Sequence, residues 1–311
     1  MKAATNEARF GRFGLAAAAL LAAALFHGSA HAQDSPLARI QAMPGGTFTL
    51  SRASIRYSTG HEKRARQVSE LVVNASRLFE DSLGLTFDVH VAVLAPADWI
   101  SFPLSPDEPY GMPWAWPGER LVVIPATLDQ GLLIRDPADT AYNRNLLDFI
   151  ALHEFGHLCN REYLYPASDR DWSSVGWFEE LMASYFAYAF LSRHDADKAR
   201  FVSDFSNGTV STTVPRLTSL DRMHQVFDEL EIQDAVANYA WYQAKLNLKA
   251  VAVYEEYGLD FVARFKRTLP WDDVKSWTTE RLLTHLERTA PGFQAWAADF
   301  EKTDGNPAES E

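Results

Sequence analysis

The sequence is poor in cysteine, with Cys159 as its single thiol in 311 residues. One cysteine cannot form a disulfide within the chain, so no disulfide framework stabilises this fold. The hydrophobic content of 47% and the nine tryptophans are instead sufficient for a sizeable apolar core. We therefore expect a globular protein in which Cys159 is a small buried hydrophobic residue.

Basic residues are also scarce, because 29 Lys and Arg stand against 41 Asp and Glu, giving a formal net charge of −12. Binding to nucleic acid requires a basic surface that neutralises phosphates. Docking on anionic lipid requires a similar basic patch. The composition therefore predicts neither nucleic acid nor an anionic membrane surface as a partner.

Long apolar runs are absent except near the N-terminus, where residues 14–26 (GLAAAALLAAALF) follow three basic residues. This run is short for a membrane span, which needs about 20 residues. The small residues of the segment 29–32 (SAHA) resemble a cleavage site before Gln33. We predict that residues 1–32 are a signal peptide. The protein would then be exported, to a bacterial periplasm or the medium, with no membrane span after cleavage.

The pattern of apolar residues predicts an α+β fold with a small N-terminal sheet. Alternation and β-branched residues indicate strands, and spacings of three and four indicate helices. In chain order we expect a strand over 53–57, a helix over 62–83 that ends at Gly84, a strand over 86–94, a proline-rich and tryptophan-rich loop over 102–118, and a strand over 120–124.

The second half of the chain is expected to be mainly helical. We assign residues 33–135 to an N-terminal α/β part, 136–301 to a helical part, and 302–311 to a polar tail. Residues 33–301 together are predicted to form one catalytic domain.

The most informative motif is His-Glu-x-x-His at positions 153 to 157, within a predicted helix over 146–163 that is apolar on nearly every face. His153 and His157 are four residues apart and would lie on one face, about 5–6 Å apart at Cβ. This spacing allows two imidazoles to bind one zinc ion, and Glu154 can then hold the water that the metal activates. We predict one Zn²⁺ per chain.

Catalytic zinc usually has a third protein ligand. The arrangement HExxHxxGxxH is excluded, because Asn160 and Tyr163 occupy the glycine and third-histidine positions. The best candidates are Glu179 and Glu180, which lie in a second apolar helix predicted over 176–193. Helical periodicity does not choose between them, since both faces of this helix are apolar.

HEFGH followed by WFEELMASY resembles the gluzincin branch of the HExxH zinc metallopeptidases. The resemblance implies a thermolysin-like catalytic domain, and its Trp-x-x-Glu-x-x-Ala pattern is matched by Trp177 and Ala183, with the third ligand at Glu180. In this family an acidic residue often stands four positions later and orients a histidine. Here that position is Ser184, which brings no charge.

The same resemblance implies a tyrosine that donates a hydrogen bond to the oxyanion, in a segment that looks like residues 238–258. Counting along that segment favours Tyr242, with Tyr239 as the alternative and His224 as a further, thermolysin-like candidate. The resemblance also implies an edge strand that binds the peptide substrate, for which the candidate is 120–124. The Met-Glu-Asn stretch of the aminopeptidases is absent, so aminopeptidase specificity is not predicted.

The sequence therefore predicts an exported zinc metallopeptidase. His153, His157 and Glu180 would bind zinc, Glu154 would act as general base, and Tyr242 would stabilise the oxyanion. The predicted partner is a peptide or protein substrate. The alternative is a zinc-containing, non-catalytic binding or scaffold protein of the cell envelope, which the neutral residue at position 184 favours.

Overall fold

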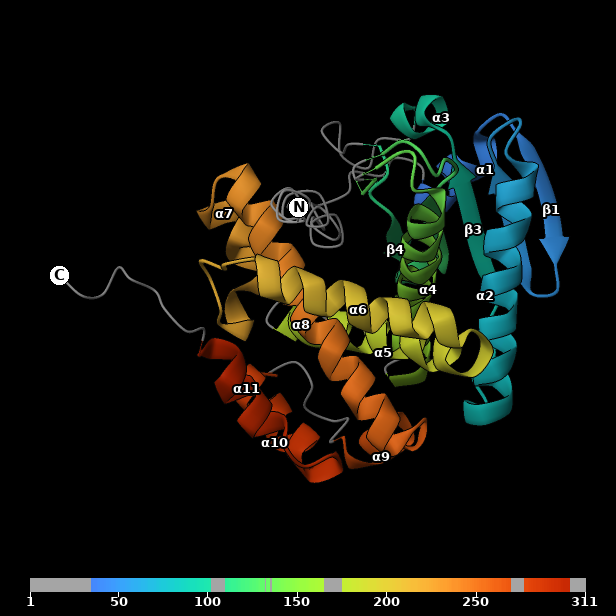
Figure 1. The fold of residues 1–311 in the computed structure, drawn as a ribbon. Coiled ribbons are helices and arrows are strands. Elements are labelled where there is room, and N and C mark those ends of the chain that lie inside the picture. Colours follow the sequence, from blue (N-terminus) through green and yellow to red (C-terminus); the bar gives the residue numbers. More distant parts are fainter. Residues whose placement is uncertain are drawn as a thin grey trace, which may run out of the picture.

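The computed structural model describes residues 35–101, 110–131, 133–134, 136–164, 175–269 and 277–302. The predicted signal peptide and nearly all of the predicted tail lie outside these residues. The fold is α+β, with a small mixed sheet on one side and a larger group of helices on the other (Figure 1).

The sheet has five strands in the order β1-β2-β3-β5-β4. The inner pairs β2–β3 and β3–β5 are parallel, whereas the outer pairs β1–β2 and β4–β5 are antiparallel. The strands are β1 (Gly46–Leu50), β2 (Ala53–Tyr57), β3 (Val89–Leu94), β4 (Trp114–Trp116) and β5 (Leu121–Pro125).

Both faces of the sheet are covered by other elements. Side chains alternate between the two faces of each strand, so β3 and β5 contribute to two cores. Val91 and Val122 point into the main core, where α2 (Glu62–Leu83) packs. Ala92 and Val123 point into a smaller core under α1 (Pro36–Ala42) and the short α3 (Pro96–Ile100). Strands β3 and β5 are therefore almost fully buried and consist mainly of valine, leucine and isoleucine, whereas β2 is less buried.

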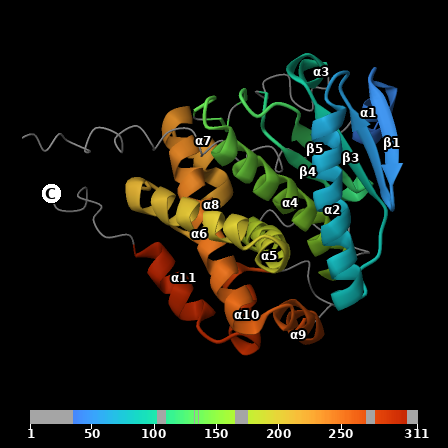
Figure 2. The same cartoon turned by 45° about the vertical axis from the view of Figure 1, so that its right-hand side comes forward.

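The helical part is built around α4 (Thr140–Leu164), which lies between the sheet and the remaining helices (Figures 1 and 2). The other elements of the helical part are α5 (Gly176–His194), α6 (Ala196–Thr212), η4 (Leu220–Gln225), α7 (Val226–Glu229), α8 (Ile232–Tyr257), α9 (Asp260–Thr268), α10 (Thr279–Thr289) and α11 (Phe293–Glu301). None of the helices in the described ranges is both long enough and apolar enough to cross a bilayer.

Most of the predicted elements are confirmed. The strand over 53–57 and the helix over 62–83 have the predicted bounds, and Gly84 ends that helix with a φ of 67°. The predicted strand 86–94 begins later, at Val89. Gly84 suits the end of helix α2 because glycine adopts the left-handed conformation at no steric cost.

The predicted substrate strand is placed differently from the expectation. The strand over 120–124 exists as β5, but it pairs with β3 on one side and β4 on the other, so it is not an edge. Within the described residues the edge on this side of the sheet is β4. The sequence predicts a loop for this tryptophan-rich stretch, because Pro113 and Pro117 flank a strand of only three residues.

Candidate metal centre

The first part of the candidate site comes from one helix, α4, which is buried around most of its circumference between sheet and helices. His153, Glu154 and His157 are all buried on it. The two histidines lie one turn apart, and their ring centroids are separated by 4.9 Å. The helix thus presents both imidazoles to the same neighbour, as the four-residue spacing predicts.

That neighbour is α5, and Gly156 allows the two helices to approach closely. A Cβ atom at Gly156 would lie 2.4 Å from the carbonyl oxygen of Ala183 and 2.9 Å from its Cα atom. Both are backbone atoms, which cannot move without moving the helix. Glycine at this position therefore brings Glu180 of α5 within reach of the two histidines.

We expect Gly156→Ala to push α4 and α5 apart and to lower both stability and zinc affinity. Overpacking of this kind typically costs about 1–3 kcal/mol of unfolding free energy. The matched control is Gly208→Ala on α6, where a Cβ meets nothing within 4 Å. Alanine there should stabilise the helix by up to about 1 kcal/mol. Urea unfolding and zinc titration of both variants check this, and equal effects in the two would contradict it.

The three candidate ligands meet at one point. The ligand atoms of His153, His157 and Glu180 all lie within 4.8 Å of one another. The Glu180 Oε2 atom is 3.0 Å from His153 Nε2 and 3.6 Å from His157 Nε2. Two ligand atoms that are each about 2.1 Å from one tetrahedral zinc ion lie about 3.4 Å apart. The separations and the nitrogen and oxygen donors therefore fit zinc.

The ionisable groups of the cluster shift one another's pKa values. Burial alone would raise the pKa of Glu180, but the neighbouring His157 and the hydrogen bond with His153 outweigh it and hold that pKa far below its usual value. Burial would lower the pKa of His157, yet Glu180 raises it to about 9. Burial lowers the pKa of His153. In the metal-free protein a protonated His157 therefore balances the Glu180 carboxylate, and a bound cation would take over that role.

Glu154 lies on the same helix, at the side of the cluster that faces the sheet. Burial raises the pKa of its carboxyl group to about 8, although His157 and a hydrogen bond from the backbone N–H of Ala115 in β4 oppose this rise. Its Oε1 atom is buried and has no hydrogen-bond partner among the described residues. An unpaired buried carboxylate oxygen is costly unless water or a ligand satisfies it.

Helix α8 closes the other side of the cluster with the face that carries Tyr239, Gln243 and Asn247, which are spaced four residues apart. The Gln243 Nε2 group donates to Glu180 Oε2 at 3.0 Å and to the Tyr239 hydroxyl at 3.1 Å. Burial raises the pKa of Tyr239, and the nearby Glu180 and Glu154 add to this rise, which is consistent with its nearness to the site.

Tyr242, the favoured oxyanion donor of the sequence analysis, does not lie at the cluster. Its hydroxyl donates to the Ser219 carbonyl at 2.7 Å, and its ring packs on Trp241 and Phe300. The physical reason is helical geometry, since Tyr242 directly precedes Gln243 and adjacent residues of a helix lie about 100° apart around its axis. The alternative, Tyr239, is the tyrosine that the structure brings to the ligands.

Two further candidates lie outside the three-residue ligand cluster, although Glu180 is near enough to His224 to oppose the fall in its pKa that burial causes. His224 in η4 lies against α5, where a Cβ at Gly176 would be 1.7 Å from its Nε2 atom. Both His224 ring nitrogens are buried without a hydrogen-bond partner in the described ranges. Glu179 is partly exposed and does not belong to the cluster, in contrast to its buried neighbour Glu180. Cys159 is buried, as predicted.

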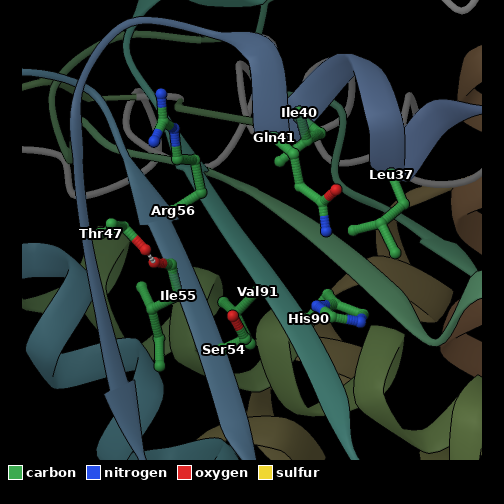
Figure 3. Close-up of a pocket in the computed structure, with 9 residues that line it drawn as sticks. All are labelled: Leu37, Ile40, Gln41, Thr47, Ser54, Ile55, Arg56, His90 and Val91. Carbon is green, nitrogen blue, oxygen red and sulfur yellow. Dashed lines mark hydrogen bonds between the residues drawn. The ribbon is translucent and has the colours of Figure 1, made fainter.

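A separate pocket lies on the other side of the sheet, between α1 and the strands (Figure 3). It contains none of the cluster residues, so it is not the site of the chemistry proposed below. Its lining consists of Leu37, Ile40, Gln41, Thr47, Ser54, Ile55, Arg56, His90 and Val91.

Comparisons of the chain with models of known families, with curated proteins and with solved structures find no match. The function proposed below therefore rests on the motif and on the arrangement of the cluster. Sequence reasoning missed Gln243 and Asn247, although buried amides four residues apart in an apolar helix were a usable signal.

Proposed function

We propose that this chain is an exported zinc metallopeptidase with a thermolysin-like, gluzincin-type site. The observation that carries the proposal is the buried group of His153, His157 and Glu180, with the unpaired Glu154 carboxylate beside it. A purely structural zinc site is normally closed by four protein ligands and needs no adjacent general base. Export is included because residues 1–32 have the pattern of a signal peptide.

Each residue of the site would have a separate role in peptide hydrolysis. His153, His157 and Glu180 would hold zinc, which supplies Lewis acidity and lowers the pKa of water to about 7. The free Oε1 of Glu154 would accept a proton from the attacking water and pass it to the leaving amine. The Tyr239 hydroxyl, in place of Tyr242, would donate a hydrogen bond to the developing oxyanion.

The edge strand β4 is the proposed position for the substrate backbone, in place of β5. An extended peptide can add to an exposed sheet edge through main-chain hydrogen bonds. The N–H of Ala115 already contacts the Glu154 carboxylate, which ties this strand to the proposed base. A peptide bound along β4 would therefore pass close to the residues that hold the metal.

The first test is hydrolysis of a mixed peptide library by the protein from Gln33 onward. We expect cleavage that a zinc chelator abolishes and that added zinc restores. Mass spectrometry of the products would give the cleaved bonds and distinguish endopeptidase from exopeptidase action. One bound zinc without cleavage of any peptide would overturn the peptidase proposal and favour the non-catalytic binding protein.

A further inference from the structure

A chain of neutral polar side chains lies behind His153, on the side away from Glu180. The Ser184 hydroxyl is 3.1 Å from His153 Nδ1 and donates to Asn247 Oδ1 at 2.7 Å. The Asn247 Nδ2 group in turn contacts the Ser206 hydroxyl at 3.3 Å. All three residues behind the histidine are buried, and they come from three helices, α5, α8 and α6.

The direction of these hydrogen bonds determines which ring nitrogen of His153 carries the proton. Because the Ser184 hydroxyl proton is used on Asn247 Oδ1, which only accepts, Ser184 is left to accept from His153. The proton of a neutral His153 is then on Nδ1, and the lone pair of Nε2 faces Glu180 Oε2 at 3.0 Å. Two acceptors at this distance need a positive charge between them, which is a proton in the hydrogen bond of the metal-free protein and would be the metal ion when it is bound.

Charge explains why a neutral chain suits this site. The cluster and its neighbour already contain two buried carboxylates, Glu180 and Glu154. Together they balance one divalent cation, so a third buried carboxylate behind His153 would leave an uncompensated negative charge. A serine and an amide can orient the imidazole without adding that charge.

We propose that Asn247, acting through Ser184, is a positioning residue that fixes His153 in the tautomer that binds metal. This relay, formed by Ser184 and Asn247, takes the place of the acidic residue that the resembling family often has at the position of Ser184. The inference rests on the metal site of the proposed function, but it does not require peptide hydrolysis. Loss of an outer partner of a metal-bound histidine typically weakens metal binding by about 10–100-fold.

The test is the zinc affinity of purified variants, measured by competition with a chromophoric chelator. We expect Ser184→Ala and Asn247→Leu to bind zinc about 10–100-fold more weakly than the wild type. Asn247→Asp keeps an acceptor oxygen for Ser184, so its zinc affinity should not fall below that of the wild type, whereas the added buried charge should lower its stability in urea unfolding. Ser69→Ala is the matched control, because it removes a buried serine of α2 that bonds only the Ala65 carbonyl among the described residues.

The outcomes separate the two proposals. Wild-type affinity in Ser184→Ala and Asn247→Leu would overturn the relay and leave the zinc site intact. Equal losses in Asn247→Leu and Asn247→Asp would also overturn it, since packing rather than the acceptor would then matter. A wild type that binds no zinc would overturn the metal site itself. A wild type that binds zinc but cleaves nothing would leave the relay standing.

Discussion

The variant Glu154→Gln is expected to keep its zinc and to lose peptide hydrolysis. Glutamine has nearly the same shape, so the three metal ligands are undisturbed, but an amide cannot accept the proton of the attacking water. General acid–base catalysis contributes about 10²–10⁴-fold to the rate. We therefore expect kcat/KM for a library-derived peptide to fall by at least about a hundredfold, with one zinc per chain by elemental analysis.

The control for this variant is Glu162→Gln on the same helix. Glu162 forms an ion pair with Arg120, with a 2.8 Å contact to Nε, near the surface and away from the ligand atoms. Because the pair lies away from the ligand atoms, this change should leave both zinc content and activity near the wild-type values, with a modest loss of stability from the two-point contact. Full activity of Glu154→Gln would show that another group takes the proton and would refute the proposed mechanism.

Local signals allowed much of the fold to be predicted. The helix over 62–83 was predictable because its apolar spacing runs unbroken up to Gly84, whose backbone suits a helix end. The position of β5 inside the sheet was not, since a strand's neighbours depend on pairing with distant segments. The three-residue β4 carried too few residues to show any periodicity.

The candidate site shows the same division. The spacing of His153 and His157 on one helix fixed their relation, and the structure brings both to Glu180. Periodicity could not decide between Tyr239 and Tyr242, because α8 is buried on more than one face and both tyrosines are in the core. The partners of each hydroxyl, which lie on other helices, make the distinction.

The second large expected effect is a loss of zinc affinity, and it distinguishes Glu180 from Glu179 as the third ligand. Glu180→Gln should bind zinc more than about a hundredfold more weakly than the wild type, which is a larger loss than an outer partner causes. The carboxylate supplies one of three ligand atoms and the negative charge that attracts the cation. Glutamine keeps the size of the side chain, so packing of α5 against α4 and α8 is preserved.

Glu179→Gln is the matched variant, with the same chemical change one residue earlier. Glu179 is partly exposed at the first turn of α5 and is not among the grouped ligand atoms, although it is near enough to help raise the pKa of His157. We expect its zinc affinity to stay within about threefold of the wild type, because neighbouring positions on a helix do not share a face. Zinc lost in Glu179→Gln and kept in Glu180→Gln would move the third ligand by one residue. Zinc kept in both would show that the two histidines hold the metal without either carboxylate.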